Sequence, residues 1–205
     1  MPNWVSTTLS VKGSKEEVQR FLDGITENQI LRSYVPCPAE LTDTVSGFLS
    51  DEEQMAELRK KQEANRAKYG YTDWYEWSYE EWGTKWGDCD THFEPLTELA
   101  DGSAEVQGCF QTAWGPADTG FRKVSALFPT LTFLFDYDEE AGFFAGLHAM
   151  KDGEIVFESM FEPCNYEGEV DWDDDESIDK YEAWKTENND RIFDEYQLFL
   201  GGVPQ

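Results

Sequence analysis

The chain has 205 residues, of which 40% are hydrophobic and 15% aromatic, so it carries enough apolar surface to fold as one decorated domain rather than remain disordered. It holds 43 acidic against 16 basic residues, and its formal net charge of -27 divides into -2 for residues 1–70 and -25 for residues 71–205. A field of this sign repels nucleic acid and anionic lipid, which argues against direct binding to either, and it attracts cations and basic protein surfaces.

The first part of the chain has strand and helix patterns followed by an irregular region. Alternating apolar residues predict a strand over residues 3–12, and a capping box precedes a predicted helix over residues 15–27. Residues 30–48 are irregular and contain the start of an insertion that we place at about residues 35–88. A second capping box begins a polar surface helix over residues 51–68.

An aromatic stretch at residues 74–86 then contains four of the eight tryptophans. At helical spacing, one stripe is formed by Tyr71, Tyr75, Tyr79, Trp82 and Trp86. Gly83 and Gly87 predict that the regular helix stops near Trp82. One interpretation is that these rings dock the insertion onto a small sheet. The other is that Trp74 and Trp77, opposite the stripe, form an exposed recognition surface.

Strand patterns return after Cys89. The predicted strands cover residues 89–99, 104–114, 131–137, 143–150 and 155–161. Between the second and third of them, Pro116 suits the first turn of a helix over residues 116–128. This order of elements predicts an α+β fold of the ferredoxin-like class, an antiparallel sheet with two helices on one face.

The C-terminal region is strongly acidic. Residues 162–195 hold 14 acids against 3 bases, and a helix is predicted from about residue 178 to residue 199. Its apolar side is formed by Ile178, Tyr181, Ile192, Tyr196 and Phe199. We therefore expect a ferredoxin-like domain over residues 1–161 and an acidic extension over residues 162–205, whose helix packs on that domain.

The stretch from Asp171 to Glu182 resembles a calcium-binding loop in part. We predict an acidic face formed by Asp171, Asp173, Asp174, Asp175, Glu176, Asp179 and Glu182. Five of these residues, Asp171, Asp173, Asp175, Asp179 and Glu182, fall at loop positions 1, 3, 5, 9 and 12. Glu176 occupies the position that requires glycine, which favours an acidic helix N-terminus and leaves weak calcium or magnesium binding as the alternative.

Several short motifs resemble the YubB-type ferredoxin-like domain family of bacteriophage and plasmid proteins. They are Pro2-Asn3-Trp4-Val5 with Leu9, the segment Val35–Leu41, Trp77 with Trp82-Gly83-Thr84-Lys85-Trp86, the segment Phe110–Pro116, and Phe128-Pro129-Thr130-Leu131. The resemblance covers residues 2 to about 150 and implies the ferredoxin-like fold and a mobile-element setting. It implies no activity and no catalytic residues, and the tail after Phe161 lies outside it.

Other candidate groups are isolated. The four cysteines have no metal or redox spacing and are expected to be reduced thiols. Cys89 and His92 form at most half of a metal site, and His148 on a strand is expected in the core. No secretion signal or membrane-spanning run is visible, which predicts a cytoplasmic location in a bacterial host.

Two functions follow from these patterns. The first is a non-enzymatic accessory protein that binds a basic or nucleic-acid-binding host or defence protein, with DNA mimicry as its sharper form. Its binding surface would consist of Trp74, Trp77, Trp82, Lys85 and Trp86 together with the acidic face. The alternative is an enzyme or small-ligand binder with a pocket between the sheet and the aromatic stretch. That pocket would be lined by Glu80, Glu81, Lys85, Asp88 and His92.

Overall fold

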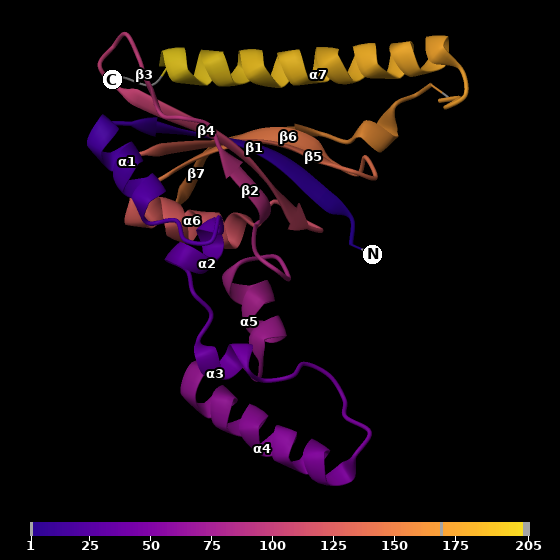
Figure 1. Cartoon of the computed structure of the whole chain (residues 1–205). Coiled ribbons are helices and arrows are strands. Elements are labelled where there is room, and N and C mark those ends of the chain that lie inside the picture. Colours follow the sequence, from indigo (N-terminus) through magenta and orange to yellow (C-terminus); the bar gives the residue numbers. More distant parts are fainter. Residues whose placement is uncertain (1, 169, 203–205) are drawn as a thin grey trace.

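A seven-stranded antiparallel sheet forms the body of the protein in this computed structural model, which describes residues 2–168 and 170–202 (Figure 1). The spatial order of the strands is β2-β4-β1-β5-β6-β7, and β3 also pairs with β4. Their bounds are β1 Trp4–Gly13, β2 Cys89–Phe93, β3 Thr97–Glu98, β4 Ala104–Ala113, β5 Thr132–Glu139, β6 Ala145–Lys151 and β7 Glu154–Phe161. The predicted α+β fold class is confirmed.

The central strands have ferredoxin-like connectivity. β1 pairs with both β4 and β5, and β2 lies outside β4, while β6 and β7 extend the sheet beyond β5. Helices α1 (Lys15–Asp23) and α6 (Asp118–Leu127) lie on the same face (Figure 1). Phe21 of α1 and Phe121 of α6 are buried in one core with the alternating apolar residues of the strands. The prediction of two helices on one face is therefore confirmed.

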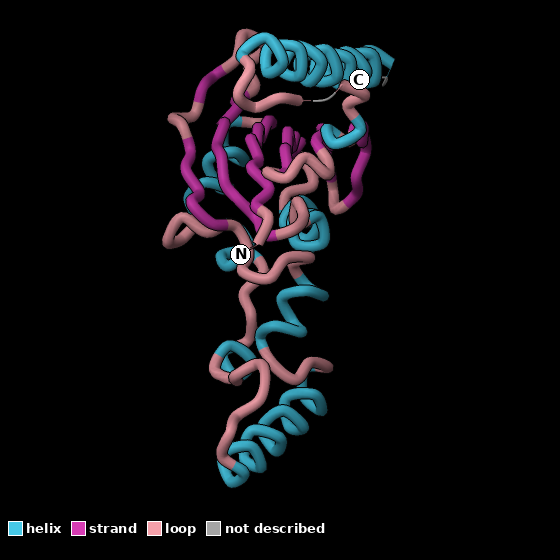
Figure 2. The backbone as a smooth tube through the Cα atoms, turned by 90° about the vertical axis from the view of Figure 1, so that its right-hand side faces the viewer, coloured by secondary structure: helices cyan, strands magenta, loops and turns pink. Residues whose placement is uncertain are grey.

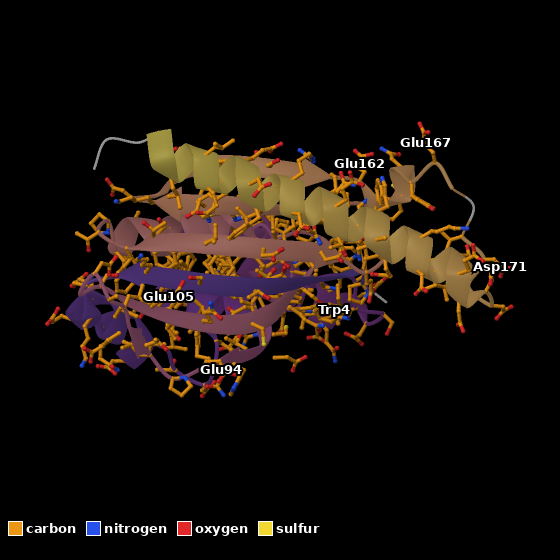
Figure 3. The ribbon with its side chains drawn as sticks, turned by 90° about the horizontal axis from the view of Figure 1, so that it is seen from above. Trp4, Glu94, Glu105, Glu162, Glu167 and Asp171 are labelled. Carbon is orange, nitrogen blue, oxygen red and sulfur yellow. The ribbon has the colours of Figure 1, made fainter. Side chains whose placement is uncertain are left out.

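Helix α7 (Asp175–Gly202) crosses the opposite face of the sheet obliquely, and Glu94 and Glu105 lie beside it rather than under it (Figure 3). Ile192 and Tyr196 are buried in a second core, where the ring centroids of Tyr196 and of Phe157 in β7 lie 5.3 Å apart. The helix begins three residues before the predicted start. Of its predicted apolar side, Ile192, Tyr196 and Phe199 face the sheet, whereas Tyr181 packs on Tyr166 and Trp172. Because α6 and α7 cover β6 from both sides, residues 145–150 are all buried.

Much of the insertion between α1 and β2 projects from the body as an arm (Figures 1 and 2). Its helices are α2 Ile30–Tyr34, α3 Ala39–Thr42, α4 Glu52–Tyr69 and α5 Trp74–Glu81. α2 packs against α6 of the body, whereas α4 lies at the far end and buries Leu58 and Asn65. Within the described part of the chain, no helix combines the length and the apolar character needed to cross a membrane.

Candidate functional site

The block Trp82-Gly83-Thr84-Lys85-Trp86 connects the arm to the body. The Trp82 indole donates a hydrogen bond from Nε1 to the Val35 carbonyl at 2.8 Å, and the ring is buried. Thr84 Oγ1 donates to the Ala113 carbonyl at 2.9 Å and accepts from the Ala113 amide at 3.2 Å, which ties the chain to the end of β4. Gly83 has φ 79°, a conformation that favours glycine, so α5 ends where the sequence predicted.

Asp88 fixes the other side of the same junction. Its buried carboxylate accepts hydrogen bonds from the Ile30 and Leu31 amides at 2.7 and 2.8 Å and from Thr91 Oγ1 at 2.7 Å. The two amides belong to the first turn of α2, where such donors otherwise lack partners. α2 is thereby held beside the aromatic stretch, although the two are separated by about 50 residues in sequence.

A cavity of about 510 Å³ opens between α5, the segment from α2 to α3, and the loop after α5. We call it the insertion pocket. Its nine lining residues are Arg32, Pro36, Cys37, Thr42, Trp74, Ser78, Trp82, Lys85 and Trp86. Its volume lies within the range of small-molecule sites, and its lining combines aromatic rings with a few polar groups, as such sites usually do.

Lys85 stands among aromatic rings at the edge of this pocket. Its Nζ lies 4.7 Å from the Trp86 ring centroid, 5.4 Å from that of Tyr75 and 5.9 Å from that of Trp114. These distances are within the range of cation-π contacts. The Trp86 ring also packs against Trp4 and Trp114, so these rings fix the position of the loop that carries the lysine.

The prediction that Trp77 lies on an exposed face is wrong. Trp77 is only 5% exposed and packs edge to face on Trp82, with ring centroids 4.9 Å apart. Tyr75 and Tyr79, which the stripe placed on the buried side, are 38% and 40% exposed. Trp74 is half-buried in the insertion pocket. Of the five residues predicted for the binding surface, four line the pocket and Trp77 belongs to the core.

The other residues predicted for a pocket do not line this one. Glu80 is exposed, and Glu81 pairs with Lys123 of α6. Asp88 is buried at the start of α2, as described above, and His92 is an exposed residue 3.8 Å from Glu94. The insertion pocket also lies against α2 and α3 rather than against the sheet. Lys85 alone of that set reaches it.

The seven residues of the predicted acidic face are all exposed, and they lie in the turn before α7 and in its first two turns (Figure 3). Asp171 Oδ1 accepts a hydrogen bond from the Asp173 amide at 3.0 Å, which shapes this turn. Since α7 begins at Asp175, predicted calcium-loop positions 5 to 12 lie on a helix and cannot wrap around an ion. Among residues 2–168 and 170–202, no three acidic, histidine or cysteine side chains are grouped to hold a metal.

His148 is in the core, as expected. It is fully buried on β6 between the rings of Phe135 and Tyr137, and burial lowers its pKa to about 4. Its Nε2 lies 3.5 Å from Asp118 Oδ1. Burial, reinforced by the charge of Glu158, raises the pKa of Asp118 to about 6.

Sequence reasoning missed Arg32, Cys37 and Trp114 as neighbours of the aromatic stretch. Trp114 lies in the segment Phe110–Pro116, and its φ of 65° is unusual for a bulky residue. The resemblance based on that segment implied no functional role for it. Arg32 lies in a segment without any periodic pattern. Long-range contacts position α2 beside the pocket, among them those of Asp88 with the start of α2 and of α6 with α2, and no local signal encodes them.

Residues 81–182 match a family described as the ferredoxin-like domain in Api92-like protein. The crystal structure of protein api92 from Yersinia pseudotuberculosis is similar to this chain with a TM-score of 0.48 at 8% identity, over 78% of this chain and 98% of that one. No curated protein sequence matches the chain. The family match of residues 81–182 confirms the ferredoxin-like part of the expected resemblance, whereas the YubB-type family and the mobile-element setting stay predictions.

Proposed function

We propose that this protein is a non-enzymatic binding protein that takes a small ligand in the insertion pocket. Its residues 81–182 match the ferredoxin-like domain in Api92-like protein. The observation that carries this proposal is the convergence of the aromatic stretch with Arg32 and Cys37 around one cavity. The pocket has preformed walls, because Trp82, Thr84 and Asp88 anchor them through buried hydrogen bonds. Preformed pockets of this composition are the usual sites of small ligands.

Ligand-observed NMR with a fragment library tests this proposal. We expect fragments that bind the wild type to lose binding to Trp74→Ala, because that ring lines the pocket. The matched control is Trp172→Ala, which removes an indole that is 65% exposed and lies near α7. Fragments that bind all three proteins equally, or an absence of bound fragments, would overturn the proposal.

A second candidate function concerns α7. We define the α7 acidic row as Glu176, Asp179, Glu187, Asp190 and Asp194, all of which are exposed. At 100° per residue they fall within one narrow stripe, opposite the buried Ile192 and Tyr196. At 1.5 Å per residue the row is roughly 27 Å long. It contains two members of the predicted acidic face and extends it along the helix.

This geometry supports the proposal that the row docks a basic, nucleic-acid-binding protein of the host or its defences by imitating the charge of DNA. The mobile-element setting implied by the YubB-type motifs fits such a partner. The test is a pull-down from bacterial lysate at low and high salt, with Asp179, Glu187, Asp190 and Asp194 changed to Asn or Gln. The control neutralises four exposed acids of α4, namely Glu52, Glu53, Glu57 and Glu63.

Nucleic-acid-binding proteins should be retained by the wild type and by the α4 control at low salt, and be lost at high salt and from the row variant. Retention of the same proteins by the row variant would contradict the α7 proposal. That result would leave the insertion pocket unaffected, because α7 and the arm that carries α5 lie on opposite sides of the sheet (Figure 1).

A further inference from the structure

We propose, building on the proposed function, that the ligand of the insertion pocket is an anion attached to a planar aromatic ring. The carboxylate or phosphate of such a ligand would contact Arg32 and Lys85, and its ring would pack on the exposed parts of Trp74 and Trp86. The inference rests on how the charges of the chain are paired, on the hydrogen-bonding groups of the pocket, and on the position of Lys85.

The charge pairing is the first argument. In this acidic chain, ten of the 16 lysines and arginines form ion pairs with carboxylates. Arg32 and Lys85 form none with the residues the structure describes, and both line the insertion pocket. None of the nine lining residues is acidic. The protein has a net charge of -27, yet two positively charged side chains without ion-pair partners among the described residues line this one cavity. Together they form a local site for an anion.

The hydrogen-bonding groups of the lining are the second argument. Ser78 Oγ donates to the Trp74 carbonyl at 2.6 Å, and Thr42 Oγ1 donates to the Pro38 carbonyl at 3.3 Å. Trp82 Nε1 is likewise occupied by the Val35 carbonyl. The strongest donors left for a ligand are the guanidinium and the ammonium groups. A ligand that satisfies them must present acceptor oxygens, and a carboxylate or phosphate matches the guanidinium fork.

The position of Lys85 is the third argument. Three aromatic rings surround its ammonium without removing its charge, so the cation is held at the pocket edge before any ligand arrives. Arg32 lies close to the Cys37 thiol in the same lining. Burial raises the pKa of that thiol, and the Thr42 hydroxyl and the positive charge of Arg32 act in the opposite direction. The two cations come from different elements, Arg32 from α2 and Lys85 from the loop after α5.

Isothermal titration of the full chain with paired probes tests the inference. The phosphate pair is adenosine 5′-monophosphate and adenosine, and the carboxylate pair is indole-3-carboxylate and indole. We expect at least one anionic probe to bind about tenfold or more tightly than its neutral partner, since charge-assisted hydrogen bonds are worth about 1.5–3 kcal/mol. The pair that shows the difference identifies phosphate or carboxylate as the recognised group.

Two variants locate the effect. Lys85→Met keeps a long apolar stem against the rings and should reduce affinity for the anionic probe about tenfold, with binding of the neutral probe unchanged. Arg32→Gln should do the same. The matched control is Lys60→Met, which removes an exposed cation of α4 that forms no ion pair with any described residue, and it should leave binding unchanged. Melting temperatures of all variants check that they are folded.

The two proposals fail in different ways. Equal binding of anionic and neutral probes, unaffected by Lys85→Met, would overturn the anion inference and leave the insertion pocket as a site for neutral aromatic ligands. A loss of affinity in Lys60→Met equal to that in Lys85→Met would also overturn it, because it would indicate attraction to the whole surface. If none of the four probes binds and the fragment screen finds no ligand, both proposals fall.

Discussion

Helices α5 and α7 both carry aromatic side chains, but α5 is enclosed at a junction and α7 rests on one surface. α5 meets α3, α6 and the segment before α3, and it buries Trp77 on one side while Trp74 faces the insertion pocket. α7 packs chiefly on β6 and β7, pairs with Asp138 of β5 through Lys185, and buries Ile192 and Tyr196 on a single side. A helix at a junction has no single buried stripe, whereas a helix on a flat sheet does.

The largest expected effect is at the junction. Trp82→Ala removes a ring that is 3% exposed, its hydrogen bond to Val35, and its edge-to-face contact with Trp77, so we expect a loss of about 4 kcal/mol in unfolding free energy. Tyr79→Ala, in the same helix but 40% exposed, should cost less than about 1 kcal/mol. Denaturant unfolding measures both, and equal losses would refute the assignment of the buried side.

β6 lies between the two helical layers, with α6 on one side and α7 on the other. It carries the buried His148, whose titration makes stability depend on pH. In the folded protein the pKa of His148 is about 4, whereas in the unfolded chain it is about 6.5. Between these two pH values the unfolded chain binds a proton that the folded protein does not. The contribution of the neutral histidine to the unfolding free energy is therefore complete above pH 6.5. About 3 kcal/mol of it is lost as pH falls from 6.5 to 4. Asp118 acts in the opposite direction. Because its pKa is raised to about 6 in the folded protein, the folded protein binds this proton first and gains stability as pH falls through about 6.

The measurement is unfolding free energy against pH for the wild type, His148→Phe and Asp118→Asn. Between pH 6.5 and 4 we expect Asp118→Asn to lose more stability than the wild type, because the loss at His148 is then unopposed. His148→Phe should lose less than the wild type. Parallel curves for all three proteins would show that neither group titrates as described.

A smaller effect is expected on the docked side of α7. Ile192→Ala removes a side chain that is 2% exposed and should reduce the unfolding free energy by about 2 kcal/mol, at the low end for such a change because a helix on one surface can settle into the space. Its neighbour Phe193 is 51% exposed, so Phe193→Ala should cost less than about 0.5 kcal/mol. A larger loss for Phe193→Ala would mean that α7 docks in another rotation.

The smallest effect is expected on the exposed side of α7. Neutralising Asp179, Glu187, Asp190 and Asp194 should change the unfolding free energy by about 0.5 kcal/mol or less, and in the stabilising direction, because like charges along the row repel one another. The gain should disappear at high salt, which screens exposed charges. A clear loss of stability would show that the row contacts the body of the protein.

The sequence by itself determined the ferredoxin-like order of elements and the docked side of α7. Alternation in the strands and the regular spacing of Ile192, Tyr196 and Phe199 are local signals, and each reflects burial against one surface. Gly83 likewise marked the end of α5, because its backbone conformation is a local requirement.

Only the tertiary structure decided which rings of α5 are buried and what faces the insertion pocket. Trp77 and Tyr79 point to opposite sides of α5, and which side is buried follows from where α3 and α6 lie. Arg32 lines the same cavity as Lys85 while Asp88 holds the start of α2, a contact between residues about 58 positions apart. Such contacts depend on the packing of whole elements, and the helical and strand periods of a single segment do not encode them.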